Sequence, residues 1–329
     1  MDRIVRRALV LAVLLWQAGC GTPPPTQMAV APAAPAKPPD AYVLAPGQVS
    51  IGAAAVYRTR PDDTLLDIAR RYDLGYTQLV AANRNIDPWL PGTGREVALP
   101  AAYILPDVPH DGIVINLSQH RLFYFPKGSN SVETFPIGVG VQGRTTPLGV
   151  TRVTGKEAHP VWVPPPSIRA EEPDLPPIVA AGPDNPLGDY ALTLGWPRYL
   201  IHGTNKPDGV GRNVSHGCMH LYPEDMARLF AEVPIGTPVR VIDQEVAAAW
   251  LGGALYVAVF PNKQQADQLD LREPVAAVAP ANLKERIRHA AGSRAAQVDW
   301  SAVEAAARDR TGMPIRITAT QFAVNSTKP

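Results

Sequence analysis

The stretch Tyr199–Leu221 reads YLIHGTNKPDGVGRNVSHGCMHL, and the fold expected of this chain follows from it. Its apolar beginning predicts a short strand that ends at His202. Glycines then predict turns, and the chain reaches Cys218 sixteen positions later. A thiol attacks as the thiolate, and a neighbouring imidazole can take its proton. This spacing lets the chain double back and set the imidazole beside the sulfur.

The residues around the cysteine leave three interpretations open. Gly217 permits a tight turn, in which successive amide N–H groups would face a developing oxyanion. A zinc site is the second interpretation, because residues two apart in an extended segment point the same way. Its ligands would be His202, His216, Cys218 and His220, although the sequence lacks the His-Glu-x-x-His motif of zinc hydrolases. A buried, unreactive cysteine is the third.

The segments His202-Gly203-Thr204-Asn205 and Ser215-His216-Gly217-Cys218 resemble the catalytic motifs of the L,D-transpeptidase family. The segment Gly143–Gly149, which reads GRTTPLG, matches a strand and turn signature of that family. The resemblance runs from about residue 112 to residue 243. It implies a mainly β catalytic domain over residues 111–243, a mixed β-sandwich, and an enzyme of peptidoglycan biosynthesis that needs no cofactor and no metal.

The resemblance also implies roles for single residues. Cys218 would attack the carbonyl between the third residue of a tetrapeptide stem, a diamino acid, and the terminal D-alanine, forming a thioester. His202 would act as general base and then as general acid. The carbonyl of Gly203 would orient the imidazole, and Ser215 and His216 would shape the pocket. The amides of His216, Gly217 and Cys218 would form the oxyanion hole. Candidate substrate-binding residues are Thr204, Asn205, Arg212, Asn213 and His220, the last standing where many members have arginine or asparagine.

The acyl acceptor stays open at this point. An amine of another stem peptide would give a 3-3 cross-link, a lysine of an envelope lipoprotein would give attachment to the wall, and water would give hydrolysis. A degenerate scaffold that binds the wall without catalysis is the non-enzymatic alternative.

A smaller module is predicted over residues 55–101. The spacing of apolar residues predicts helices over 65–72 and 76–83, with Asp63 or Thr64 as the first N-cap, and strands at each end, near 57–59 and over 96–99. The segments Asp63-Thr64-Leu65 and Val97-Ala98-Leu99-Pro100 resemble the lysin motif, LysM. The resemblance implies a βααβ fold that binds the N-acetylglucosamine-containing glycan of peptidoglycan. Asp62 and Thr59 depart from the residues common in that motif.

The amino terminus reads as a bacterial secretory signal over residues 1–20. Arginines precede the apolar run Ala8–Trp16, which is shorter than the roughly 20 residues that span a bilayer. Small residues before Cys20 resemble the lipobox of lipoproteins, in which the cysteine is lipidated. We therefore expect an exported, periplasmic protein held to a membrane leaflet by lipid, more readily the outer membrane. Prolines and alanines over 21–50 predict an extended tether.

Composition narrows the partners. The chain has 31 Lys+Arg and 30 Asp+Glu, a formal net charge of +1, which disfavours electrostatic binding of nucleic acid. Its two cysteines are far apart and predict no disulfide framework. Its 36 prolines, about 11% of the chain against a usual 5% or so, concentrate in the tether and in residues 159–197. The second stretch therefore predicts a long loop with little regular structure.

The remaining segments predict secondary structure without a function. Residues 113–117 and 121–125 predict a hairpin. The glycines of 138–143 match a dinucleotide-binding pattern, but Pro147 would break the helix that such a site needs, so a turn between strands is favoured. After residue 243 we expect a small α+β region over 254–329, with strands over 254–260 and 314–318 and helices over 262–271, 283–291 and 300–310.

Overall fold

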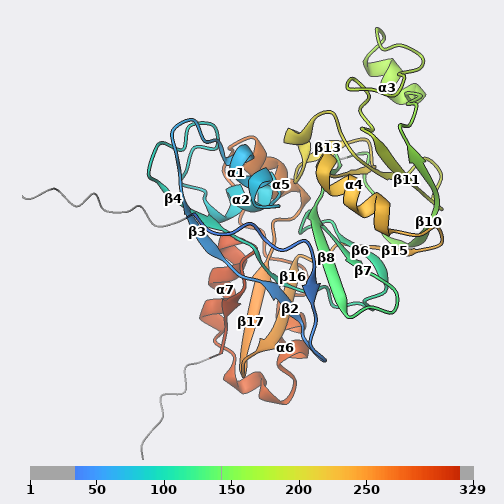
Figure 1. Ribbon diagram of the computed structural model, residues 1–329. Coiled ribbons are helices and arrows are strands. Elements are labelled where there is room, and N and C mark those ends of the chain that lie inside the picture. Colours follow the sequence, from blue (N-terminus) through green and yellow to red (C-terminus); the bar gives the residue numbers. More distant parts are fainter. Residues whose placement is uncertain (1–33, 142, 319–329) are drawn as a thin grey trace, which may run out of the picture. The chain divides into compact units, whose positions relative to one another are not determined.

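The computed structural model describes residues 34–141 and 143–318, which belong to one compact unit beginning at residue 34 (Figure 1). The predicted signal peptide, its Cys20 and residues 21–33 of the predicted tether lie outside the described residues. Within the described part, no helix combines the length and the apolar character needed to cross a membrane.

The main sheet runs in the order β1-β8-β7-β6-β15-β10-β11-β12-β14. Neighbouring strands are antiparallel except for the parallel pairs β6/β15 and β12/β14. Its strands are β1 (Tyr42–Val43), β6 (Gly112–Asn116), β7 (Arg121–Phe125), β8 (Ser131–Pro136), β10 (Gly149–Ala158), β11 (Tyr190–Leu194), β12 (Leu200–His202), β14 (Met219–His220) and β15 (Pro238–Ile242). The predicted hairpin of residues 113–125 is confirmed as β6 and β7.

One buried cluster joins the two ends of this sheet. It combines Ile115 of β6 with Leu192 of β11 and Met219 of β14, and helix α4 (Pro223–Glu232) closes it with Met226. A second cluster lies on the other face of β6 to β8 and includes Val114. Strands covered on both faces read as continuous apolar runs, which is why β6 and β7 lack an alternating pattern. The predicted mainly β catalytic domain is confirmed.

The LysM-like module has the predicted βααβ order. It consists of β3 (Ala55–Arg58), α1 (Leu65–Arg71), α2 (Tyr76–Ala82) and β4 (Glu96–Leu99), with β3 and β4 antiparallel. Thr64 is the N-cap of α1, and it forms a reciprocal capping box with Asp67. A buried cluster that includes Leu65 and Leu79 fills the space between the helices and the strand pair.

The carboxyl-terminal region forms a three-stranded sheet in the order β16-β17-β18 among the described residues. Figure 1 shows α6 and α7 beside β16 and β17. The elements are β16 (Val246–Leu251), β17 (Ala254–Val259), α6 (Leu283–Ala291), a 3-10 turn (Gly292–Gln297), α7 (Trp300–Asp309) and β18 (Ile315–Arg316). Strand β16 was not predicted, although the Gly252-Gly253 pair that follows it is a hairpin signal.

Two expectations need correction. The predicted tether of 21–50 is too long, because β1 pairs with β8, β2 (Ser50–Gly52) pairs with β5 (Ala102–Ile104), and Tyr42 packs on the second buried cluster. Helix α5 (Lys263–Asp270) was expected in the carboxyl-terminal region. It packs instead on the LysM-like module, where Leu269 joins the buried cluster of α1 and α2.

The predicted long loop of 159–197 contains two regular elements. Helix α3 (Pro166–Glu171) lies on an excursion from the sheet (Figure 1), and β11 occupies an interior position of the sheet. The glycine-rich segment of 138–143 begins as strand β9 (Val139–Gly140), which pairs with β13 (Asn213–Ser215). This strand stands where a dinucleotide site would need the start of a helix. A 3-10 turn (Pro207–Gly209) precedes β13.

Candidate active site

Strands β12 and β14 bring the segments that carry His202 and Cys218 side by side. Ile201 pairs with Met219 and His202 pairs with His220. Ile201 and Met219 point into the main core. Because side chains alternate along a strand, His202 and His220 point to the opposite face. Cys218 directly precedes β14, and its Sγ contacts the carbonyl of Arg198 just before β12, so the turn that carries the cysteine lies beside the strand that ends in His202.

His202 is held in one orientation. Its Nδ1 lies 2.6 Å from the carbonyl oxygen of Gly203, the contact expected for that residue. A carbonyl oxygen accepts only, so Nδ1 carries the proton and Nε2 keeps its lone pair. Burial, together with the neighbouring His220, lowers the pKa of His202 to about 3. The imidazole is therefore neutral at pH 7 and can accept a proton through Nε2.

The Cys218 thiol lies at the end of the turn that precedes β14. Its Sγ lies 3.6 Å from the carbonyl oxygen of Arg198, to which the thiol donates. Burial raises the pKa of the thiol, whereas the backbone N–H of Leu200 lowers it by favouring the thiolate. The resting site therefore pairs a neutral thiol with a neutral imidazole.

The turn before the cysteine is fixed by side chains on both sides. The hydroxyl of Ser215 donates to the carbonyl of Cys218 at 2.6 Å and accepts from the N–H of Gly217 at 3.1 Å. Thr146 donates to the carbonyl of Gly217 at 2.9 Å. Gly217 has φ +108°, and a Cβ there would lie 2.9 Å from the ring of Tyr199.

These contacts bear on the expected oxyanion hole. The N–H of Gly217 is occupied by Ser215, so its predicted availability as a donor does not hold in this state. Among the described residues, the N–H groups of His216 and Cys218 have no hydrogen-bond acceptor. Gly217 instead gives the turn its left-handed backbone, a conformation that a side chain would disfavour.

His220 lies beside His202 and packs against two glycines rather than facing substrate. It is 5% exposed, and its ring lies 6.1 Å from that of His202, centroid to centroid. A Cβ on Gly138 would lie 2.1 Å from the His220 ring, and one on Gly209 would lie 2.9 Å from it. Burial lowers the pKa of His220 to about 4. Its expected role in substrate binding is therefore replaced by packing against these two glycines.

The other candidate substrate-binding residues divide into two groups. Thr204 is buried and accepts from the N–H of Lys206, and the Oδ1 atom of Asn205 is buried without a partner among the described residues. Arg212 and Asn213 instead bind helix α5. Arg212 pairs with Asp270 at 2.7 Å, and Asn213 donates to Asp267 at 2.7 Å. The last two are engaged with protein rather than free to take substrate.

The structure adds residues that sequence reasoning missed. Glu171 of α3 pairs with Arg144 and lies 3.3 Å from the Nε2 of His216. Partial burial and the charge of Arg144 lower the pKa of His216. Helix α3 is thereby tied to the catalytic turn. No local pattern marks Glu171, because its partners lie 27 and 45 positions away.

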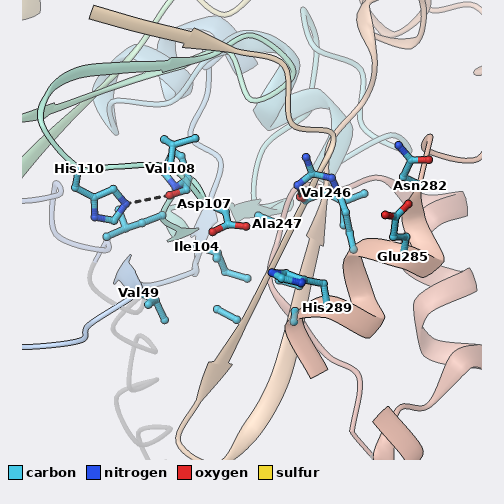
Figure 2. Close-up of a pocket in the computed structure, with 16 residues that line it drawn as sticks. Val49, Ile104, Asp107, Val108, His110, Val246, Ala247, Asn282, Glu285 and His289 are labelled. Carbon is cyan, nitrogen blue, oxygen red and sulfur yellow. Dashed lines mark hydrogen bonds between the residues drawn. The ribbon is translucent and has the colours of Figure 1, made fainter. Parts of the chain in front are cut away.

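A metal site and a cavity are the two other kinds of candidate functional site. Among residues 34–141 and 143–318, no group of three or more His, Cys, Asp or Glu side chains is arranged to hold a metal ion. The residues considered as zinc ligands do not converge, since His216 contacts Glu171 of α3 whereas the ring of His220 packs against Gly138 and Gly209. A cavity of about 640 Å³ lies between the segment after β5, with Asp107 and His110, and helix α6, with Glu285 (Figure 2). Its lining includes neither Cys218 nor His202.

This cysteine and histidine arrangement on a mainly β scaffold defines a thiol acyltransferase type of site. The sequence matches the L,D-transpeptidase catalytic domain, named YkuD, over residues 110–241 and the LysM domain over residues 57–88. The chain is 40% identical over 257 residues to "Probable L,D-transpeptidase YbiS" of Escherichia coli K12, covering 76% of this chain and 81% of that protein. The chain therefore belongs to the L,D-transpeptidase family.

Two further relatives are likewise named probable L,D-transpeptidases. "Probable L,D-transpeptidase ErfK/SrfK" of Escherichia coli K12 is 38% identical over 79% of this chain and 83% of its own length. "Probable L,D-transpeptidase YcfS" of the same strain is 37% identical over 76% of this chain and 79% of its own length. These matches are longer than the catalytic domain of residues 110–241.

Proposed function

We propose that this protein is a peptidoglycan L,D-transpeptidase in which Cys218 is the nucleophile and His202 the general base. The observation that carries the proposal is the pairing of β12 with β14, which brings the segments of His202 and Cys218 together, with the Gly203 carbonyl holding the imidazole through Nδ1. The neutral imidazole takes the thiol proton as sulfur attacks the carbonyl before the terminal D-alanine. It then gives that proton to the departing amine of D-alanine, leaving a thioester on Cys218.

The second half of the reaction regenerates the thiol. An acceptor amine attacks the thioester carbonyl, passes its proton to His202, and forms an amide as the thiolate leaves. His202 returns the proton to sulfur. The N–H groups of His216 and Cys218 support the tetrahedral intermediates, since removal of one such donor in comparable sites costs about 10²–10³ in kcat.

The test uses the full chain with a disaccharide tetrapeptide and mass spectrometry of the products. We expect loss of D-alanine and a cross-linked dimer from the wild type and neither product from Cys218→Ala. The matched control Ser118→Ala, a hydroxyl bound to Asp243, should retain both products. No D-alanine loss from the wild type would reject the enzyme and favour the wall-binding scaffold.

The acceptor is resolved in the same reaction. We propose that a stem-peptide amine is the acceptor, giving a 3-3 cross-link. Adding a lysine-containing peptide that mimics an envelope lipoprotein tests the alternative of protein attachment. Free tripeptide as the main product would identify hydrolysis. The three products differ in mass, so one spectrum distinguishes them.

We propose that the LysM-like module binds peptidoglycan glycan through the loop between α2 and β4. Trp89 and Leu90 in this loop are 51% and 82% exposed, and Asp87 accepts from both of their backbone N–H groups. An exposed aromatic face suits the apolar face of a sugar ring. Sedimentation of the Cys218→Ala chain with purified sacculi should therefore weaken in Trp89→Ala. Equal sedimentation of both variants would contradict this site.

We further propose export with lipid attachment at Cys20, a residue outside the described part of the chain. The lipobox-like sequence supports this proposal. Acyl chains contribute about 0.8 kcal/mol per buried methylene, so several chains hold a protein to a leaflet. Fractionation of cells should release the Cys20→Ala protein into the periplasmic extract. Retention of that variant in the outer membrane would refute the anchor.

A further inference from the structure

The loop between His202 and Cys218 is hydrogen-bonded to the LysM-like module. The N–H groups of Tyr76 and Thr77, at the start of α2, donate to the carbonyls of Val210 and Gly211 at 3.2 and 3.1 Å. Gly75 and Gly211 meet backbone to backbone. A Cβ on Gly211 would lie 2.3 Å from the Cα of Gly75 and from the N atom of Tyr76. Only glycine at position 211, with φ +81°, allows this approach.

Helix α5 holds the following residues of the same loop. Arg212 pairs with Asp270 at 2.7 Å, and its guanidinium lies 5.1 Å from the ring centroid of Tyr76. Asn213 donates to Asp267 of the same helix. Because α5 itself packs on α2, the module and the helix together hold residues 210–213 in place.

A continuous set of contacts runs from residues 210–213 to the turn that carries Cys218. The N–H of Val139 donates to the carbonyl of Arg212 at 3.0 Å, and that of Val141 donates to the carbonyl of Ser215 at 2.8 Å. Lys263 of α5 donates to the carbonyl of Gly140. A Cβ on Gly140 would lie 2.8 Å from the Cα of Gly217. Strand β9 is therefore wedged between α5 and the turn that carries the cysteine.

We propose that the LysM-like module positions the catalytic cysteine, with Gly211 and the Arg212–Asp270 pair as positioning residues. This inference rests on the proposed function for its catalytic readout. The module and α5 fix residues 210–213, in the middle of the loop whose two ends carry His202 and Cys218. A displacement of about 1 Å at a reacting group can lower a rate by about 10²-fold. Contacts with the loop, rather than the presence of the module alone, therefore set the rate of acylation.

The first experiment compares two glycine substitutions in the full chain. Gly211→Ala and the control Gly128→Ala both place a side chain at positive φ, +81° and +75°, but a Cβ on Gly128 meets nothing within 4 Å. We expect Gly211→Ala to lower kcat for D-alanine release at least tenfold with KM changed less than threefold, the pattern of a lost positioning contact. Gly128→Ala, in the turn between β7 and β8, should change both parameters less than twofold.

Thiol reactivity gives a second readout that does not depend on substrate. Burial raises the pKa of Cys218, so release of the turn should move the pH of half-maximal alkylation by iodoacetamide downward, toward that of an exposed thiol. This shift should appear in Gly211→Ala and be absent in Gly128→Ala. Thermal unfolding of both variants establishes that they are folded at the assay temperature.

Substitutions at the Arg212–Asp270 ion pair test the same proposal if Gly211→Ala fails to fold. Asp270→Asn should lower kcat, and Asp270→Glu should recover at least half of the loss because it keeps the carboxylate. Arg58→Ala is the control, since Arg58 of β3 pairs with Glu96 of β4 within the module at 2.6 Å. It should retain wild-type kcat.

The outcomes separate this inference from the proposed function. Wild-type kcat and alkylation in Gly211→Ala and Asp270→Asn would overturn the inference and leave the proposed function intact. Equal losses in the variants and their controls would also overturn it, because they would report general loosening. A wild type that releases no D-alanine would reject the proposed function, and the alkylation profiles alone would then decide the inference.

Discussion

The protonation state of the catalytic pair can be read from its surroundings and tested directly. At pH 7 the imidazole of His202, with a pKa of about 3, is four pKa units from protonation, which corresponds to about 5 kcal/mol. An unperturbed thiol is roughly 3% thiolate at pH 7, and burial reduces that fraction for Cys218. The resting enzyme therefore contains no appreciable thiolate–imidazolium pair, and the proton moves only during attack.

Alkylation of Cys218 by iodoacetamide across pH 5 to 10 measures this state. We expect the rate to rise about tenfold per pH unit between pH 6 and 8, as for a thiol titrating above its usual pKa of about 8.5. Mass spectrometry of the peptide that contains Cys218 excludes reaction at Cys20. Cys218→Ala supplies the background.

A different pH profile would refute this reasoning. A plateau in the alkylation rate from pH 5 to 8, with an inflection below pH 7, would mean that the resting site is a stabilised ion pair. In that case His202 would be charged, and burial would not be the dominant influence on its pKa. The mechanism would then begin from a preformed thiolate rather than from general-base catalysis.

Three further substitutions test the fold around the site. Arg121→Ala should lower the free energy of unfolding in urea by about 3–5 kcal/mol, because its buried guanidinium donates to the carbonyl of Asp73 in the LysM-like module at 2.6 Å. The control Arg58→Ala, at an exposed side chain, should cost less than about 1 kcal/mol, and similar losses in the two variants would contradict this assignment. Burial raises the pKa of Glu133 to about 8, so its stabilising contribution is present below its unfolded pKa of about 4.5 and is lost as pH rises through 8. Glu133→Gln should flatten the pH dependence of unfolding across that window, and an unchanged slope would reject the shift. Gly138→Ala should lower kcat about tenfold or more and stability by about 1–3 kcal/mol, because the Cβ meets the ring of His220 at 2.1 Å; a fully active variant would show that this ring does not support the site.

Much of the secondary structure follows from local sequence. The spacing of Leu65, Ile68 and Ala69 predicted α1, and the capping residue Thr64 set its start. The hairpin β6/β7 followed from two β-rich runs. Strand β16 was missed because its alanines have weak β propensity, and the pairing with β17 supplies what the local sequence lacks.

The candidate site divides in the same way. A cysteine and a histidine at close spacing pointed to thiol chemistry, and the family resemblance supplied the expected contact of the Gly203 carbonyl with His202, which lies at 2.6 Å from Nδ1. The tasks of Arg212, Asn213 and His220 could not be predicted. Each of these side chains is committed to a partner from another segment, and such a choice depends on packing rather than on neighbours in the sequence.

The sequence by itself determined the family and the βααβ module, and it singled out Cys218 and His202 as the proposed reactive pair, since these are written in local patterns and motifs. Only the tertiary structure decided that β12 and β14 bring the segments of His202 and Cys218 together and that their linking loop is bound by α2 and α5. The physical reason is that strand register, burial and backbone contact such as that of Gly75 with Gly211 arise between segments distant in sequence. Those contacts set the protonation and the position of the reacting groups.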